Sequence, residues 1–273
     1  MVTTLTNQKE KDETAKEERE RKLNEFQDWL MSGIIDPQRA SEIIELYYEE
    51  NPFQVKKMKI YIDIETIPTQ NREHQDFVCE NLKPPANYKN EETINKWLEE
   101  NKELAVNKTS LDGAFGEVVV ISAAINDDEV VTFYRNDWQV KDREKDILAR
   151  FNNWLKEQAN RCKTVPVFIG HNVTSFDGLF LWQRYIINGV KPYYKMDKRN
   201  TYDTMLEWCG YNRESKPSLN KLCQVLNVEQ KGDIDGSKVW QAVQDGRIDE
   251  VAEYCAKDVE RVRAIYKRMN FEV

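Results

Sequence analysis

Four acidic residues and one tyrosine lie at the boundaries of apolar segments that are far apart in the chain. Asp63 and Glu65 lie in KIYIDIETIP, and Asp177 lies in FIGHNVTSFDGLFL. Tyr254 and Asp258 lie in EYCAKDVERV. Acids in such places need a partner of opposite charge, because a buried and unpaired carboxylate is costly. Two divalent metal ions would supply that charge, and a two-metal carboxylate site is typical of enzymes that cut phosphodiester bonds.

The spacing of Asp63 and Glu65 favours a shared cation. Side chains at positions i and i+2 of a strand point to the same face, so these two carboxylates are expected to repel unless a proton or a cation lies between them. Hard oxygen ligands suit Mg²⁺ or Mn²⁺. An acidic chain contains several such pairs by composition alone. The informative detail is therefore their position at the carboxyl end of an apolar strand, where α/β sheets tend to place their sites.

The other candidate residues also have purely structural interpretations. Asp177 could be a helix N-cap or a first-turn acid favoured by the helix dipole. Tyr254 and Asp258 are four residues apart, on one helical face, and could be a core tyrosine and an ordinary surface acid. Taken singly, these interpretations are favoured, and the combination of the three segments is what indicates a site. His171, beside Asn172, is more typical of a positioning residue than of a metal ligand.

Composition indicates a soluble globular protein. Charged residues make up 32% and hydrophobic residues 40% of the chain, and no apolar run approaches the roughly 18 residues of a membrane span. The amino terminus lacks the apolar segment of a signal peptide, so we expect a cytoplasmic protein without a membrane partner. Five cysteines without a CxxC pair predict reduced thiols. The net charge of −8 argues against broad coating of a duplex, although a local groove could still bind strand ends.

The elements that would position these residues predict an α/β layer fold. Three strands come first and are followed by alternating helix and strand, which implies a mixed sheet flanked by helices. Strands are expected at 58–65, 117–125, 129–134 and 165–169, with Asn126-Asp127-Asp128 as a tight hairpin turn. Helices are expected at 91–104, around 147–155, and at 176–188, 218–226, 237–244 and 249–269.

The chain is expected to have two parts. Residues 1–52 are strongly charged and carry an apolar stripe from Leu23 onwards, which predicts an N-terminal helical hairpin. Its stripe could dock on the main domain, on another copy of the chain or on a partner. Residues 58–273 would form the main domain, interrupted at 69–112 by a polar excursion that is too long for an ordinary connection.

The three acidic segments together resemble the three signature motifs of the 3′–5′ exonucleases with an Asp-Glu-Asp-Asp core and a tyrosine in the third motif. These enzymes form the DEDDy group of the DnaQ-like, RNase H-like superfamily. DIETIP, GHNVTSFD and YCAKDV are most similar to the proofreading exonuclease domain of family B DNA polymerases and to its stand-alone, phage-type relatives. The resemblance covers roughly residues 58–270 and implies an RNase H-like mixed sheet flanked by helices.

The resemblance also implies roles for individual residues. Two Mg²⁺ or Mn²⁺ ions would be held by the four acids, with Asp63 bridging both, Glu65 and Asp258 completing the first and Asp177 holding the second. Tyr254 would orient the attacking water, because a free tyrosine has a pKa near 10 and is a poor base at neutral pH. The products would be nucleoside 5′-monophosphates removed from single-stranded or frayed 3′ ends, in proofreading or end processing during DNA replication or repair.

Substrate contacts are expected at four positions that the resemblance carries over. Thr66 and Ile67 match positions that contact or wedge the terminal nucleotide, and Asn172 and Phe176 match positions that hold the next one, Phe176 by stacking. Residues 191–200 (KPYYKMDKRN) interleave aromatic and basic side chains. That composition suits either a grip for a single strand or a solvated connector.

Two alternatives to a DNA exonuclease remain at this point. An exoribonuclease of the same group would differ in its contacts to the 2′-hydroxyl, which no motif reports, although the DIETIP and GHN forms favour DNA. A catalytically inactive module that binds nucleic acid or a partner is disfavoured, because all five signature positions are filled. Expected partners are single-stranded DNA 3′ ends together with a DNA polymerase or other replication protein, or a second copy that associates through the N-terminal helices.

Overall fold

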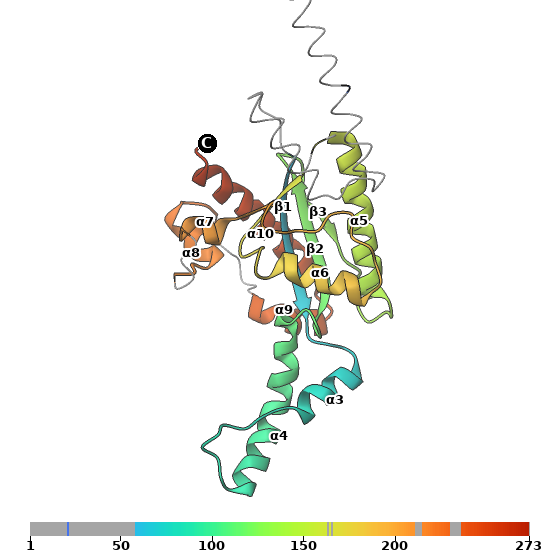
Figure 1. The fold of residues 1–273 in the computed structure, drawn as a ribbon, viewed down its shortest axis with the longest axis vertical. Helices are drawn as coiled ribbons and strands as arrows, with labels where there is room; N and C mark the ends of the chain where they lie inside the picture. Colours follow the sequence, from blue (N-terminus) through green and yellow to red (C-terminus); the bar gives the residue numbers. More distant parts are fainter. Residues whose placement is uncertain are drawn as a thin grey trace, which may run out of the picture. The chain divides into compact units, whose positions relative to one another are not determined.

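A mixed five-stranded sheet, in the order β3-β2-β1-β4-β5, is the centre of the computed structural model (Figure 1). The structure describes residues 58–162, 164, 166–210, 215–229 and 236–272, together with Arg21. The sheet consists of β1 (Met58–Ile67), β2 (Glu117–Ile125), β3 (Val131–Phe133), β4 (Pro166–Gly170) and β5 (Thr201–Asp203). β1 pairs antiparallel with β2 and parallel with β4, so the sheet is mixed as expected.

The strands follow from runs of β-branched and apolar residues. β1 reads MKIYIDIETI and β2 reads EVVVISAAI, which confirms the strands predicted at 58–65 and 117–125. The predicted hairpin turn is also present: Asn126 has a φ of 49° and the amide of Asp128 donates to the carbonyl of Ile125 over 2.8 Å. β3 is shorter than the predicted 129–134, and its register with β2 covers only three pairs.

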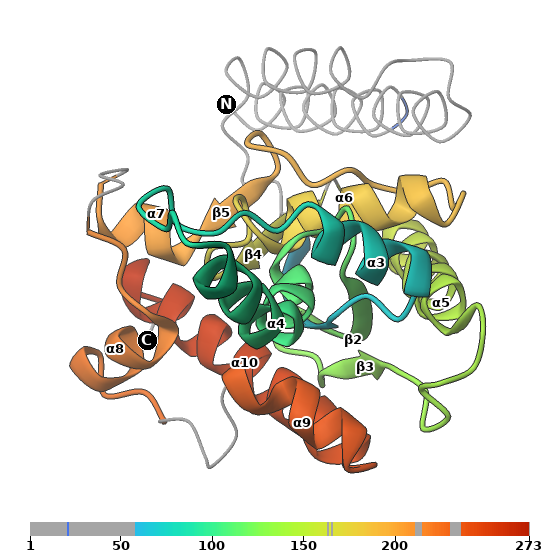
Figure 2. The same cartoon turned by 90° about the horizontal axis from the view of Figure 1, so that it is seen from below.

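Alternate residues of β1 face two different helical layers. Ile60, Ile62 and Ile64 belong to a core cluster shared with α5 (Arg143–Cys162) and α6 (Asp177–Ile187). Side chains on the opposite face contact α8 (Leu219–Val225), α9 (Val239–Gln244) and α10 (Ile248–Met269). In Figure 2 the strands lie between these two layers. The alternation places Asp63 and Glu65 on the α10 face of the sheet.

The excursion at 69–112 folds as a helical arm. It contains α3 (Arg72–Glu80), α4 (Glu91–Lys108) and the 3₁₀ turn η1 (Thr109–Leu111). Figure 1 shows α3 and α4 extending beyond the end of β1, away from the sheet, and neither helix contains a buried residue. The base of the arm is fixed by hydrogen bonds, one of which joins the Thr69 amide to Thr109 Oγ1 over 2.9 Å. The helix predicted at 91–104 is thus confirmed and is one turn longer.

Most of the predicted helices are confirmed, and short elements were missed. The helices at 147–155, 176–188, 218–226 and 249–269 correspond to α5, α6, α8 and α10, and the one at 237–244 begins with the 3₁₀ turn η2 (Gly236–Lys238). α3, β5 and α7 (Thr204–Trp208) were not predicted. The N-terminal hairpin expected at 1–52 lies outside the described residues. No helix within the described ranges is long and apolar enough to span a bilayer.

Candidate active site

The two acids of β1 converge with a cysteine of α10. Ligand atoms of Asp63, Glu65 and Cys255 all lie within 4.8 Å of one another. Cys255 is fully buried, and its thiol donates to the backbone carbonyl of Asp63 over 3.4 Å. The Oδ2 atom of Asp63 is buried and has no hydrogen-bond partner among the described atoms. A buried carboxylate oxygen without a donor is costly, and a bound cation is one group that could satisfy it.

The third acid reaches the same place from the other side of β1. Asp177 is 4% exposed at the first position of α6, and its Oδ1 accepts a hydrogen bond from the Ile64 amide over 3.2 Å. Ile64 lies between Asp63 and Glu65 in the chain. The helix start is therefore attached to the part of β1 that carries the other two acids.

A tight turn between β4 and α6 makes this approach feasible. A Cβ on Gly170 would lie 2.6 Å from the Cβ of Val173 and 3.2 Å from the Ile62 carbonyl oxygen, so only glycine fits there without a shift of the chain. Asn172 takes a left-handed conformation with a φ of 64°, which asparagine tolerates better than most residues. These two positions return the chain from the sheet to the start of α6.

Asp203, at the end of β5, stabilises that turn, and sequence reasoning missed it. Its carboxylate accepts hydrogen bonds from the amides of Asn172 (2.9 Å) and Thr174 (3.0 Å). The same carboxylate caps the N-terminus of α7 by accepting from the Met205 amide. The signal available in the sequence was an aspartate just before the helix-forming run TMLEW, which is typical of an N-cap.

α10 brings the fourth acid and the tyrosine. Asp258 is 3% and Tyr254 6% exposed, both on the face that covers the sheet. The buried guanidinium of Arg261 donates to Asp258 Oδ1 over 2.7 Å and to the Glu229 carbonyl over 3.3 Å. Arg261 therefore fixes the orientation of the Asp258 carboxylate, a role that the sequence motif did not indicate.

The other three acids influence the ionisation of Asp63. Burial, followed by the negative charges of Asp258, Glu65 and Asp177, raises the pKa of Asp63 well above its usual value. Burial raises the pKa of Asp177 to about 7, against the opposing effect of backbone hydrogen bonds. Asp63 and Asp177 therefore disfavour their ionised forms, and a cation placed beside them would reverse that preference.

Tyr254 and Cys255 are neutral groups in this cluster. Burial and the charges of Asp258, Glu65 and Asp63 raise the pKa of Tyr254, so its phenol keeps its proton at neutral pH. Burial and the charges of Asp63 and Glu65 also raise the pKa of Cys255 well above its usual value. Because thiolates rather than thiols ligate metals, the available ligands are carboxylate oxygens, which fit Mg²⁺ or Mn²⁺.

His171 makes hydrogen bonds through both ring nitrogens. Nδ1 lies 3.0 Å from Thr204 Oγ1, and Nε2 lies 3.0 Å from the Pro217 carbonyl oxygen. These bonds join the β4–α6 turn to α7 and to the segment before α8. Both ring nitrogens are thus engaged within the protein, as a positioning role requires.

The four expected substrate residues differ in their placement. Ile67 is fully buried in the core cluster shared with α9 and α10, so its side chain has no exposed surface and its role beside the terminal nucleotide stays a prediction. The hydroxyl of Thr66 donates to the Ser110 carbonyl over 2.6 Å and thereby helps to anchor the arm. Asn172 and Phe176 lie in the turn before Asp177, and the Oδ1 of Asn172 is buried without a hydrogen-bond partner among the described atoms. Their contacts with substrate stay a prediction.

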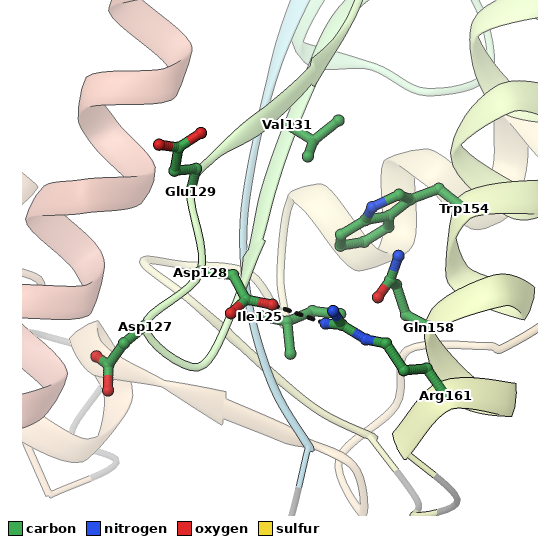
Figure 3. A pocket seen from close by; sticks show the side chains of 8 residues that line it. All are labelled: Ile125, Asp127, Asp128, Glu129, Val131, Trp154, Gln158 and Arg161. Carbon is green, nitrogen blue, oxygen red and sulfur yellow. Dashed lines mark hydrogen bonds and ion pairs between the residues drawn. The ribbon is translucent and has the colours of Figure 1, made fainter.

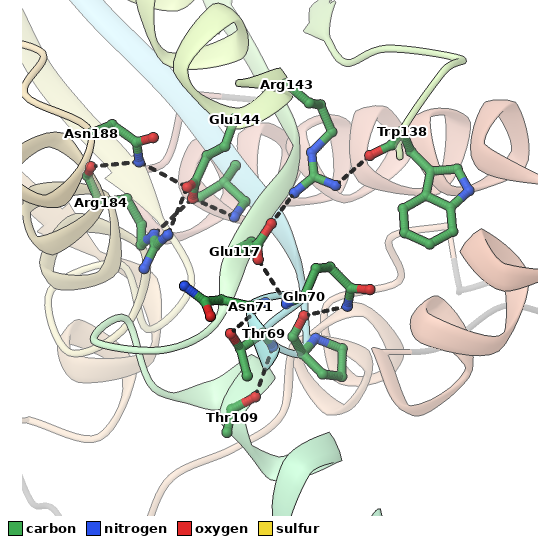
Figure 4. A network of polar contacts seen from close by, with 12 residues as sticks. Thr69, Gln70, Asn71, Thr109, Glu117, Trp138, Arg143, Glu144, Arg184 and Asn188 are labelled. Atoms are coloured by element: carbon green, nitrogen blue, oxygen red, sulfur yellow. Dashed lines mark hydrogen bonds and ion pairs between the residues drawn. The ribbon is translucent and has the colours of Figure 1, made fainter. Parts of the chain in front are cut away.

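A buried ion-pair network joins α6 to α5 and β2 (Figure 4). Glu144 accepts from Arg184 through both carboxylate oxygens (2.8 and 2.7 Å) and also from the Val118 amide (2.7 Å). Arg143, the neighbour of Glu144, pairs with Glu117 at 2.6 Å. These contacts join α5, α6 and β2, and so hold the helix that carries Asp177 against the sheet.

A separate pocket of about 500 Å³ lies between the β2–β3 hairpin and α5 (Figure 3). Its wall includes Trp154 and Val131, and its rim carries an ion pair between Arg161 and Asp128 at 2.7 Å. None of the predicted site residues lines this pocket. The carboxylate cluster is therefore a distinct feature of the fold.

Comparisons with known proteins agree with this fold. The structure of the family B DNA polymerase from the hyperthermophilic archaeon Pyrobaculum calidifontis is similar, with a TM-score of 0.50 and 15% sequence identity over 80% of this chain. The match covers 25% of the polymerase, so this chain spans about a quarter of its length. Comparison with curated proteins gives no significant match. Residues 109–272, more than half of the chain, match a family described as "Predicted 3′-5′ exonuclease related to the exonuclease domain of PolB". The chain belongs to this family of exonucleases related to the PolB exonuclease domain.

Proposed function

We propose that this protein is a two-metal-ion 3′–5′ exodeoxyribonuclease that acts on single-stranded or frayed 3′ ends. The observation that supports the proposal is a buried Asp63 oxygen that lacks a partner among the described atoms, next to Glu65 and under the electrostatic influence of Asp258 and Asp177. Membership of a PolB-related exonuclease family supports the same reaction and direction. The products would be nucleoside 5′-monophosphates.

In the proposed reaction the metal-binding, water-orienting and supporting residues have separate roles. The four acids would hold two Mg²⁺ or Mn²⁺ ions, which when bound would activate the attacking water and neutralise charge on the departing 3′-oxygen. Tyr254, as a neutral phenol, would orient that water by a hydrogen bond. Asp203 and His171 would keep the turn that carries Asn172 and Phe176 in place, so that these two side chains hold the nucleotide before the terminal one.

The biological role would be proofreading or end processing in DNA replication or repair. The similar solved structure is that of a DNA polymerase of which this chain spans about a quarter. This similarity supports a DNA polymerase, or another replication protein, as the partner of this chain.

The direct test is digestion of 5′-labelled single-stranded DNA and RNA oligonucleotides with Mg²⁺, followed on a sequencing gel. We expect a ladder of products shortened from the 3′ end, with faster digestion of DNA. Asp63→Asn should slow digestion by more than about a hundredfold, since loss of an outer-shell partner alone costs up to that factor. A folded Asp63→Asn variant that retains activity within tenfold of the wild type would remove the two-metal proposal.

A further inference from the structure

The loop at residues 191–200, between α6 and β5, is an ordered element. Asn152 of α5 holds its first part through hydrogen bonds to the Tyr193 amide and the Lys191 carbonyl. Its second part closes on itself: Asn200 Nδ2 donates to the Lys195 carbonyl over 2.9 Å, and Thr201 Oγ1 donates to the Asp197 carbonyl over 2.7 Å. A merely solvated connector would not be fixed at both of its ends.

This loop lies beside the start of α6. A Cβ on Gly178, the neighbour of Asp177, would approach the Cβ of Met196 to 3.1 Å. One helical turn further on, the ammonium group of Lys195 lies 4.2 Å from the ring centroid of Trp182. Gly178 and Trp182 share a face of the helix, and Figure 2 shows the chain between α6 and β5 following α6. The loop therefore leads along α6 to the acid cluster.

The loop carries an excess of positive charge. Its ten positions contain four basic residues and one acid, in a chain with a net charge of −8. Lys191, Lys195 and Lys198 are exposed and form no salt bridge within the described ranges, whereas Arg199 pairs with Asp197. The ring of Trp182 restricts the Lys195 ammonium, because a cation over an indole face is attracted to it.

We propose that residues 191–200 are a second binding site, which takes the phosphates of single-stranded DNA upstream of the 3′ end. The inference rests on the proposed nuclease function. Metal ions at the acid cluster would neutralise only the reacting end of the strand, and the rest of an anionic strand would be repelled by an acidic protein. Single-strand sites commonly track the backbone with a cationic groove, and the loop offers exposed lysines beside the start of α6.

The test compares binding of short and long strands. Lys195→Gln/Lys198→Gln removes two charges from the loop, and Lys145→Gln/Lys156→Gln removes two exposed charges from α5 as a matched control. Affinity for labelled oligothymidylates of about three and about twelve nucleotides, within and beyond the scale of one single-strand site, is measured by fluorescence anisotropy with Ca²⁺ to limit cleavage. We expect the loop variant to weaken only the longer complex. The slope of log K against log salt concentration should become shallower by about 0.7 for each phosphate that the variant no longer neutralises.

Three outcomes each overturn the loop site. They are an equal loss of affinity for both strand lengths, the same loss in the α5 control, and an unchanged salt dependence with the longer strand. Hydrolysis of the p-nitrophenyl ester of thymidine 5′-monophosphate separates the two proposals, because this small substrate needs only the acid cluster. Ester hydrolysis that Asp63→Asn abolishes and the loop variant retains keeps the nuclease function whatever the binding result. A wild-type protein that binds the long strand through the loop but hydrolyses neither substrate removes the nuclease function and keeps the loop site.

Discussion

Two acids in this protein, Glu144 and Asp63, have opposite surroundings. Glu144 is buried against Arg184, which donates to both of its oxygens, and an amide of β2 supplies a further donor. Asp63 is surrounded by three other carboxylates, and one of its buried oxygens has no donor among the described atoms. The first acid is compensated by the chain itself and holds α5, α6 and β2 together. Asp63 has no such compensation at that oxygen, which folding alone does not favour and which a bound metal ion would supply.

The largest effect should come from breaking the compensated pair. Glu144→Gln keeps the shape of the side chain but leaves Arg184 as a buried charge without its counter-ion, so we expect a loss of about 3–5 kcal/mol in the free energy of unfolding. Urea denaturation measures it. The matched control is Glu253→Gln, which removes an exposed carboxylate that pairs with Lys257. The control should not change stability measurably, and equal effects of the two substitutions would contradict the distinction.

Ionisation of Asp177 should change stability in the opposite sense from ionisation of an ordinary salt-bridged acid. The pKa of Asp177 is raised from 3.8 to about 7 in the folded state, so its contribution to stability is complete below pH 4 and is lost as the pH rises through 7. The loss approaches about 1.4 kcal/mol per pH unit within that window. The difference in Tm between samples with Mg²⁺ and with EDTA should therefore grow from pH 5 to pH 8.

Asp177→Asn is the control for this measurement, because it removes the titrating group and keeps the shape. The variant should show a smaller change with pH in EDTA than the wild type does. A metal-free wild type whose stability rises from pH 5 to pH 8 relative to Asp177→Asn would contradict the raised pKa.

Tyr254→Phe tests the neutral donor within the acid cluster. Loss of one positioned hydrogen-bond donor should lower kcat by about ten- to a thousandfold with little change in KM. Because the pKa of Tyr254 is raised, the pH profile of the wild type should show no step that the phenylalanine variant lacks. Tyr134→Phe, which removes a phenol that donates to Asp249 outside the cluster, is the matched control. If both variants matched the wild type, the water-orienting role of Tyr254 would be wrong.

The parts of the fold that could be predicted from the sequence are those with a strong local pattern. The apolar runs of β1 and β2 and the helical spacing in α5 and α10 predicted their elements, because period and propensity agree there. The motifs also located all four acids. α3, β5 and α7 were missed because each is short or exposed, so burial leaves little periodic signal in the sequence.

The remaining features of the site depend on contacts between segments that are distant in sequence. Asp203 supports the turn before Asp177 from another strand. Arg261, which pairs with Asp258 on the same helix, is also held by the Glu229 carbonyl of the segment after α8. Ile67 was assigned to substrate because it follows the acid pair, yet alternation along β1 turns it into the core beside α9. Motif position predicts candidate ligands, but it does not report which neighbouring side chain faces the core.

Arg261 tests whether a fixed cation and the expected metal ions can share one acid. Its guanidinium donates to Asp258 at 2.7 Å, and both side chains are buried. A hydrogen-bonded partner orients a metal-ligating carboxylate, and its removal typically costs about ten- to a hundredfold in metal affinity or activity. Arg261→Met should therefore raise the Mn²⁺ concentration needed for half-maximal activity, and Arg261→Lys should restore part of the affinity. If excess Mn²⁺ fully rescues Arg261→Met, Arg261 acts only by orienting a metal ligand. If Arg261→Met instead bound Mn²⁺ more tightly than the wild type in calorimetry, the arginine would compete with the metal for Asp258. The contrast between Glu144 and Asp63 would then be weaker than their contacts indicate.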